Sequence, residues 1–174
     1  MEPPRGGLIM PGYLKEMAAY NAWQTHVVVG HLDALGQAER TAERGLFFGS
    51  LHRTFDHIAT IDRWILDVVE GVGIKAIDLK DMVFGDWPDL KAERDRLDRR
   101  IDDLAARADQ AWLDGVVVIE SRSFGRSRRI PRGLYLVQMF NHQTHHRSQI
   151  TAALWQMGID YGGTDIPFRP DSPY

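Results

Sequence analysis

The sequence predicts an all-α fold, an antiparallel four-helix bundle with a short hairpin or extended crossover before the last long helix. Three observations predict it. Four segments repeat apolar residues every three or four positions, a β-branched segment separates the third from the fourth, and glycine or proline marks the segment ends. Four helices of these lengths without an internal repeat favour a bundle. With 174 residues, 44% of them hydrophobic, we expect residues 1–174 to form a single domain.

The first two predicted helices have clear apolar faces. The first spans Pro11 to about Leu35 and is followed by Gly36, a typical stop signal. The second extends from about Leu46 to Val69, and its main apolar stripe consists of Phe47, Leu51, Phe55, Ile58, Ile65 and Val69.

The third predicted helix begins at Asp86 and runs to about Ala108. Its apolar residues alternate with dense charge, so we expect it to be amphipathic and largely exposed. Between Trp112 and Pro131 the pattern changes, because Val116 to Ile119 are β-branched and turn residues follow them. This segment predicts the hairpin or extended crossover.

The last predicted helix covers about Arg132 to Met157. The tail after it has turn composition and is expected to wrap the surface without forming another element. The basic stretch Arg122 to Arg132 could bind an anionic group, but such stretches are more often solvated hairpins or loops, and we favour that interpretation.

Composition excludes several classes of function. The net charge of -3 comes from 21 basic and 24 acidic residues spread along the chain, so we expect neither nucleic acid nor a membrane as partner. No segment approaches the roughly 20 apolar residues that span a bilayer, and we expect a soluble cytoplasmic protein. Because the chain has no cysteine, any metal must be bound by imidazole and oxygen.

The chief chemical signal is the clustering of five of the seven histidines: His52, His57, His142, His145 and His146. Residues four apart lie about 40° apart on a helix surface and one turn apart along it, so His142 and His146 can bind one ion. Their stripe is otherwise apolar, which predicts that both rings face the interior. His145 is rotated about 60° the other way, towards the edge of the stripe.

The second helix offers a third ligand. His57 shares an inward line with Ile61, whereas His52 lies about 140° away around the helix, so His57 is the better candidate. Asp62 falls in the apolar stripe and could orient a ligand or a bound water. An isolated H-x-x-x-H pair is more often a pair of ordinary core or surface histidines than a metal site. An inward His57 makes these two interpretations about equally supported.

Three segments resemble a known family. F-F-G-S-L-H-R-T-F-D-H-I-A-T-I-D-R-W-I-L (Phe47 to Leu66) and F-N-H-Q-T-H-H-R-S-Q (Phe140 to Gln149) look like the two signature segments of DinB-like proteins, and Y-N-A-W (Tyr20 to Trp23) is a weaker match. The resemblance implies a four-helix bundle with a metal held by three histidines, here His57, His142 and His146. The family usually has glycine where this chain has Ser148, a departure that should affect packing and not ligation.

The resemblance also bears on chemistry. DinB-like proteins include thiol transferases that use low-molecular-weight thiols and a maleylpyruvate isomerase. The resemblance also implies that the protein is a homodimer. We therefore expect a small-molecule substrate and one divalent ion, zinc or nickel first, with iron and manganese as alternatives. The ion would activate an external thiol or a water, with Asp62, His145 or His52 as proton acceptor. The alternative is a non-catalytic, stress-response type of bundle protein in which the ion is structural.

Overall fold

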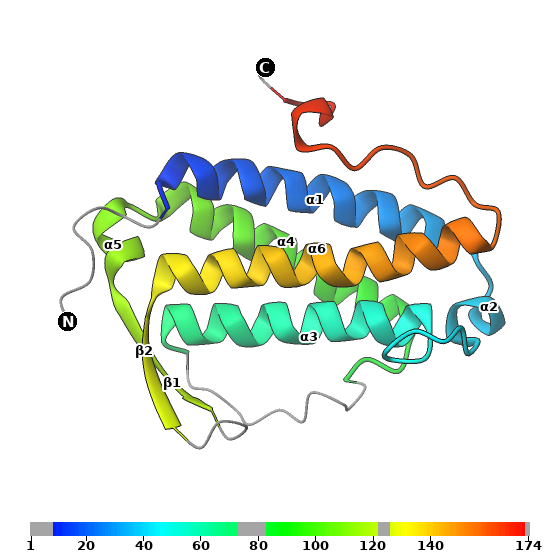
Figure 1. Ribbon diagram of the computed structural model, residues 1–174, viewed down its shortest axis with the longest axis horizontal. Coiled ribbons are helices and arrows are strands. Elements are labelled where there is room, and N and C mark those ends of the chain that lie inside the picture. The colour runs from blue at the N-terminus through cyan, green and yellow to red at the C-terminus, as the bar shows by residue number, and fades with distance from the viewer. Residues whose placement is uncertain (1–8, 73–82, 122–125, 173–174) are drawn as a thin grey trace.

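The computed structural model describes residues 9–72, 83–121 and 126–172 and is mostly helical, with one small antiparallel sheet. Its four long helices lie side by side (Figure 1). The elements in chain order are α1 (Pro11–Ala34), α2 (Gln37–Thr41), α3 (Leu51–Glu70), α4 (Trp87–Arg107), α5 (Gln110–Asp114), β1 (Val116–Ser121), β2 (Arg126–Pro131), α6 (Arg132–Gln156) and the 3-10 helix η1 (Ile166–Phe168). The buried apolar residues of the long helices form one core between them.

The long helices differ from the predicted antiparallel arrangement in one respect. Helices α1 and α6 run in one direction and α3 and α4 in the other, as the colour gradient of Figure 1 shows. The neighbours α3 and α4 are therefore parallel, which matches the pairing of Asp62 with Arg94 and of Asp67 with Arg100 further along both helices. Apolar periodicity identifies helices and their faces but not the direction of their neighbours, so the sequence could not predict this pairing.

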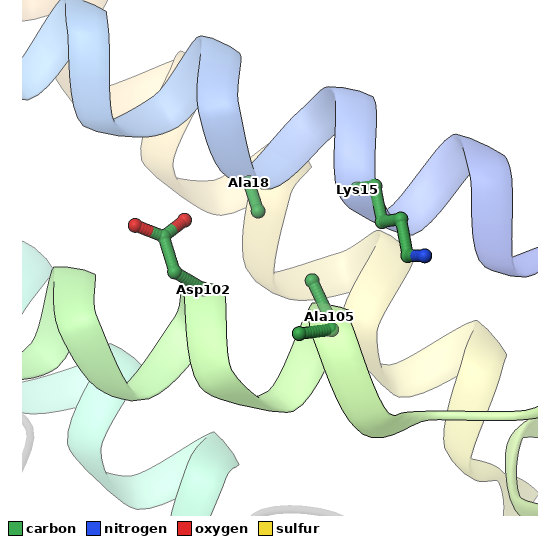
Figure 2. Close-up of a pocket in the computed structure, with 5 residues that line it drawn as sticks. Lys15, Ala18, Asp102 and Ala105 are labelled. Carbon is green, nitrogen blue, oxygen red and sulfur yellow. The ribbon is translucent and has the colours of Figure 1, made fainter.

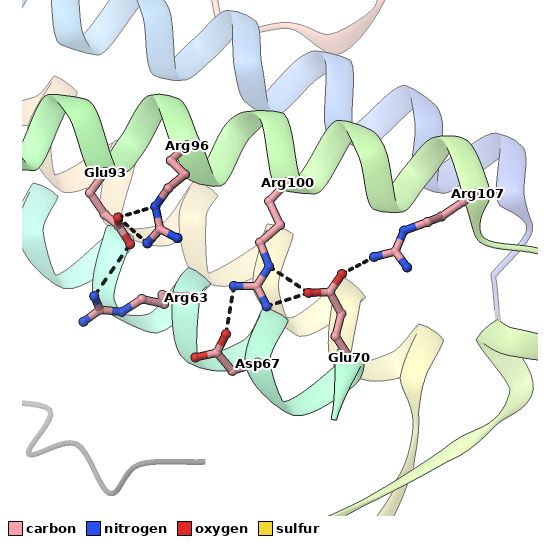
Figure 3. A network of polar contacts seen from close by, with 7 residues as sticks. All are labelled: Arg63, Asp67, Glu70, Glu93, Arg96, Arg100 and Arg107. Atoms are coloured by element: carbon pink, nitrogen blue, oxygen red, sulfur yellow. Dashed lines mark hydrogen bonds and ion pairs between the residues drawn. The ribbon is translucent and has the colours of Figure 1, made fainter. Parts of the chain in front are cut away.

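A row of ion pairs lines the outer seam between α3 and α4 (Figure 3). Arg100 lies 2.8 Å from Asp67 and 2.5 Å from Glu70, which also pairs with Arg107. The guanidinium of Arg107 is largely exposed. Exposed pairs of this kind contribute about 0 to 1 kcal/mol each, so the seam depends mainly on the apolar core beneath it.

Helix α3 begins later than the sequence predicted. Ser50 is its N-cap, with extended backbone and a side-chain oxygen that accepts a hydrogen bond from the Arg53 amide. The preceding residues form a turn that includes Gly49, whose φ of 84° favours glycine. Leu46 and Phe47 therefore precede the helix, and assigning Phe47 to its buried stripe was wrong because that side chain is exposed.

The predicted hairpin is present as β1 and β2, which pair antiparallel with Val117 opposite Ile130. In the basic stretch, Arg132 donates a hydrogen bond to the Val69 carbonyl at 3.1 Å, while Arg128 and Arg129 are exposed. Arg132 thus connects the start of α6 to the end of α3. Part of the stretch, including Arg122, lies outside the described residues.

Two short helices, α2 and α5, were not predicted, because five-residue segments show no measurable periodicity. The tail lies along α1: Tyr20 donates to the Thr164 carbonyl at 2.9 Å and Gln24 to the Gly163 carbonyl at 3.3 Å. The sequence predicted no further element in the tail, and this was wrong for the three residues of η1.

An open pocket lies between α1 and α4 (Figure 2). It is lined by Lys15 and Ala18 from α1 and by Asp102, Ala105 and Ala106 from α4. The small alanine side chains leave space between the two helices and supply no reactive group. Among the described residues, no helix has both the length and the apolar character needed to cross a bilayer.

Candidate metal centre

Three histidines from two facing helices converge in the interior. The Nε2 atoms of His57 on α3 and His142 on α6 are 3.1 Å apart, and His146 completes the group one turn further along α6. One ring nitrogen from each of the three lies within 4.8 Å of the others. Within the described part of the chain, these three residues form the group that could hold a metal ion.

The helix geometry explains why His57 and not His52 takes part. His57 is on the face of α3 that packs against α6, whereas His52 is buried on another side. The Nε2–H of His52 donates a hydrogen bond to the Phe84 carbonyl at 2.8 Å, just before α4. The preceding Asp56 accepts hydrogen bonds from the amides of Val83 and Phe84 at 3.0 and 2.7 Å. The side chains of His52 and Asp56 therefore bind the backbone just before α4 and do not join the histidine group.

Gln149 orients one of the rings. Its Oε1 lies 2.9 Å from Nδ1 of His146, and because an amide oxygen only accepts, Nδ1 must carry the proton. The Nε2 of His146 then has a free lone pair for a cation. Hydrogen bonding of the second nitrogen is the usual way in which proteins fix a metal-binding histidine.

Phe48 covers the site from the turn before α3. Its ring stacks on His57 with centroids 4.0 Å apart and lies 5.5 Å from the ring of His146. The adjacent Phe47 makes an edge contact with Phe48 at 4.9 Å and is 80% exposed. Sequence reasoning did not identify Phe48 or Gln149 as site residues, although both lie within the segments that resemble DinB-like proteins.

Three residues were predicted as proton acceptors, and His52 is bonded to the Phe84 carbonyl, whereas Asp62 and His145 have different surroundings. Asp62 is completely buried, and its Oδ2 accepts hydrogen bonds from Arg94 and, at 2.7 Å, from Gln143. His145 is exposed, with its ring 4.7 Å from that of His146. Their catalytic roles stay predictions.

The donor set fits a divalent ion of borderline character. Two ligands at about 2.0–2.1 Å from a tetrahedral zinc ion are about 3.3 Å apart, close to the 3.1 Å between the Nε2 atoms of His57 and His142. Two facing imidazole nitrogens can share only one proton, and a cation between them would satisfy both lone pairs. Neutral imidazole is the form that binds metals.

The imidazole rings of His142 and His146 on α6 are kept in this neutral form by their surroundings. Burial, reinforced by the neighbouring histidines His146, His57 and His145, lowers the pKa of His142 to about 3. Burial also lowers the pKa of His146, against the opposing effect of the hydrogen bond that His146 donates to Gln149. The folded protein therefore resists protonation of His142 and His146.

This shift predicts a pH effect on metal-free protein. The folded pKa of His142 lies below the ordinary value of 6.5, so the unfolded chain binds more protons between these values. The contribution of the neutral His142 ring to the free energy of unfolding is therefore present above pH 6.5 and is lost as the pH falls below it. From pH 6.5 to 5 the loss should reach at most about 2 kcal/mol, measured by urea unfolding.

A His142→Gln variant provides the reference curve. Asp98, whose pKa burial raises to about 6, acts in the opposite direction, but it is common to both proteins and cancels in their difference. Parallel stability curves for wild type and variant over this range would contradict the prediction.

The comparisons with known proteins identify the family of the chain. No curated protein matches the sequence. The family model for the DinB family matches residues 10–173, nearly the whole chain, including both helices that carry the histidines. The chain therefore belongs to the DinB family.

Proposed function

We propose that His57, His142 and His146 bind one divalent metal ion and that the protein is a metal-dependent transferase or hydrolase acting with an external thiol or water. The observation that carries the proposal is the convergence of three imidazole nitrogens within 4.8 Å, on two facing helices. Family membership supports metal binding, and it leaves the substrate open.

A divalent ion on three neutral imidazoles keeps at least one position open and lowers the pKa of a water or thiol bound there. The chain's own residues prepare that position. Gln149 fixes the tautomer of His146, and Phe48, which stacks on His57, would limit the access of water to that ring. The thiol must come from outside, because the chain has no cysteine.

We propose His145 as the proton acceptor at the rim, because it is exposed and its ring lies beside that of His146. For Asp62 the surroundings support a different contribution, since Oδ2 is occupied by Arg94 and Gln143. Asp62 would act on the site through Gln143, the neighbour of His142 in the chain.

Zinc or nickel is the ion we propose, because imidazole ligands suit both and no carboxylate joins the group among the described residues. Elemental analysis of protein purified without an affinity tag, which could itself bring nickel, identifies the ion. Iron or manganese as the resident ion would correct the identity and leave the ligands unchanged.

The main test couples metal binding to turnover. Zinc or nickel added to metal-free protein should raise the melting temperature and allow transfer of a low-molecular-weight thiol to a chromogenic aryl halide, with halide as leaving group, or hydrolysis of a nitrophenyl ester. Stabilisation by the metal without turnover across a broad panel of electrophiles and thiols would overturn the enzyme proposal and favour a structural ion.

Phe47 supports an apolar group on the substrate, because it is exposed next to the ring that covers His57. Phe47→Ala should raise KM for the aryl substrate about 2- to 10-fold, as loss of one aromatic contact does, with little change in metal affinity. Phe168→Ala is the matched control, since Phe168 is likewise exposed, at 79%, but lies in η1, an element that carries none of the three histidines. Equal KM values in both variants would refute this role of Phe47.

Two further proposals concern assembly. The packing of α1 with α4 and of α3 with α6 supports a four-helix bundle as the architecture of the long helices. The homodimer that the family resemblance implies stays a prediction.

A further inference from the structure

On α6, each histidine of the site is followed by a buried polar residue. Gln143 follows His142 and is completely buried, and Arg147 follows His146 and is 6% exposed. Successive residues on a helix point about 100° apart, so the histidines can face α3 while the next side chains point deeper among the helices. These inner side chains need partners, because an unpaired buried polar group is costly.

Gln143 finds its partner on α3. Its amide donates a hydrogen bond to Oδ2 of Asp62 at 2.7 Å. The same oxygen accepts a hydrogen bond from Arg94 on α4, and both members of this ion pair are fully buried. Arg94 also lies 2.8 Å from Oδ1 of Asp98, one turn along α4.

Arg147 finds its partner on α1. Its guanidinium donates to Oδ1 of Asn21 at 2.5 Å, and the amide of Asn21 donates to Oδ1 of Asp98 at 3.1 Å. The two chains of contacts therefore meet at Asp98. Together they form a closed interhelical network that joins all four long helices through six side chains: Asn21, Asp62, Arg94, Asp98, Gln143 and Arg147.

We propose that this interhelical network positions the metal ligands by fixing the rotation and the axial height of α6 against the other three helices. Both of its ends lie on α6, at the residues directly after His142 and His146. A shift of α6 by one residue, about 1.5 Å and 100°, would break both ends, whereas an apolar contact surface would tolerate repacking. Two aspartates and two arginines balance in formal charge, so the network can stay buried. The role rests on the proposed metal site.

The test uses Asn21, which lies on a helix that supplies no ligand. Asn21→Ala should weaken Co²⁺ binding by about 10-fold, in the range found when an outer partner of a metal ligand is lost, and should change the visible d–d absorption of the bound cobalt. Gln24→Ala is the matched control, because Gln24 is also a buried amide on α1 but bonds to the Gly163 carbonyl in the tail. It should lose stability while keeping wild-type affinity and spectrum.

Arg147→Met is the second variant, since it keeps the volume without the donors and does not depend on Asn21→Ala folding. Circular dichroism confirms folding before each titration. A wild-type spectrum and affinity in folded Asn21→Ala and Arg147→Met would overturn the positioning role, as would equal losses in Gln24→Ala. Failure of the wild-type protein to bind Co²⁺ would instead overturn the metal site itself.

Discussion

His142→Ala should reduce the bound metal from about one ion per chain to less than a tenth of that. Two imidazoles would remain for an ion that we propose is bound by three, and the loss in affinity should exceed the roughly 10–100-fold that removal of an outer partner causes. The rise in melting temperature on adding metal should disappear as well, because that rise depends on binding to the folded state. Elemental analysis and thermal unfolding with and without metal measure both effects.

Alanine at His57 or His146 should have the same result, since each supplies one nitrogen of the group. His145→Ala and His31→Ala are the controls. His145 lies directly beside His146 in the chain but points outward, so it tests whether position in the fold or mere proximity in sequence matters. Full metal occupancy in His142→Ala, or loss of metal in His31→Ala, would contradict the ligand assignment.

Helical periodicity predicted which histidines face inward, and the resemblance to DinB-like proteins then implied that these three hold a metal. Counting from Ile61 placed His57 inward, and counting from the apolar stripe of α6 placed His142 and His146 inward. The structure brings these three together and leaves His52 on the other side of α3. Local geometry alone left a metal site and ordinary core histidines about equally supported, and the resemblance to DinB-like proteins decided between them.

The cover of the site could not be predicted in the same way. The apolar spacing of Phe47 continues the stripe of α3 backwards, so periodicity alone extends the helix to Leu46. The N-cap at Ser50 ends that pattern, and the turn before it places Phe48 on His57. Ser50 could have given the signal, since serine is a strong N-cap residue.

The interhelical network could not be predicted from the sequence for another reason. Arg94 and Asp98 lie in a densely charged helix, which predicted exposure, yet Arg94 is 1% exposed. A charged residue is rarely buried unless it is paired, and the buried partner of Arg94 on α3, Asp62, is distant from it in sequence. The resemblance included Asn21, Asp62 and Arg147 among its motif residues, but only the packing shows that they belong to one network.

Arg94→Leu should lower the free energy of unfolding by about 3–5 kcal/mol, because it leaves the carboxylate of Asp62 buried without its countercharge. Burial already raises the pKa of Asp62 with Arg94 in place, and removing the guanidinium would raise it further. An acid with a raised folded pKa is destabilising when the pH is above that pKa and less so as the pH falls. The penalty measured by urea unfolding should therefore be smaller at pH 5 than at pH 8.

Two companion variants separate this effect from a general loss of packing. The double variant Asp62→Leu/Arg94→Leu should recover most of the lost stability, because buried ion pairs can often be replaced by apolar residues of similar volume. Arg107→Ala removes an arginine from the same helix, but its guanidinium is largely exposed, so the change should stay within about 1 kcal/mol. If the double variant is no more stable than Arg94→Leu alone, the penalty comes from packing, and the uncompensated charge of Asp62 is not its cause.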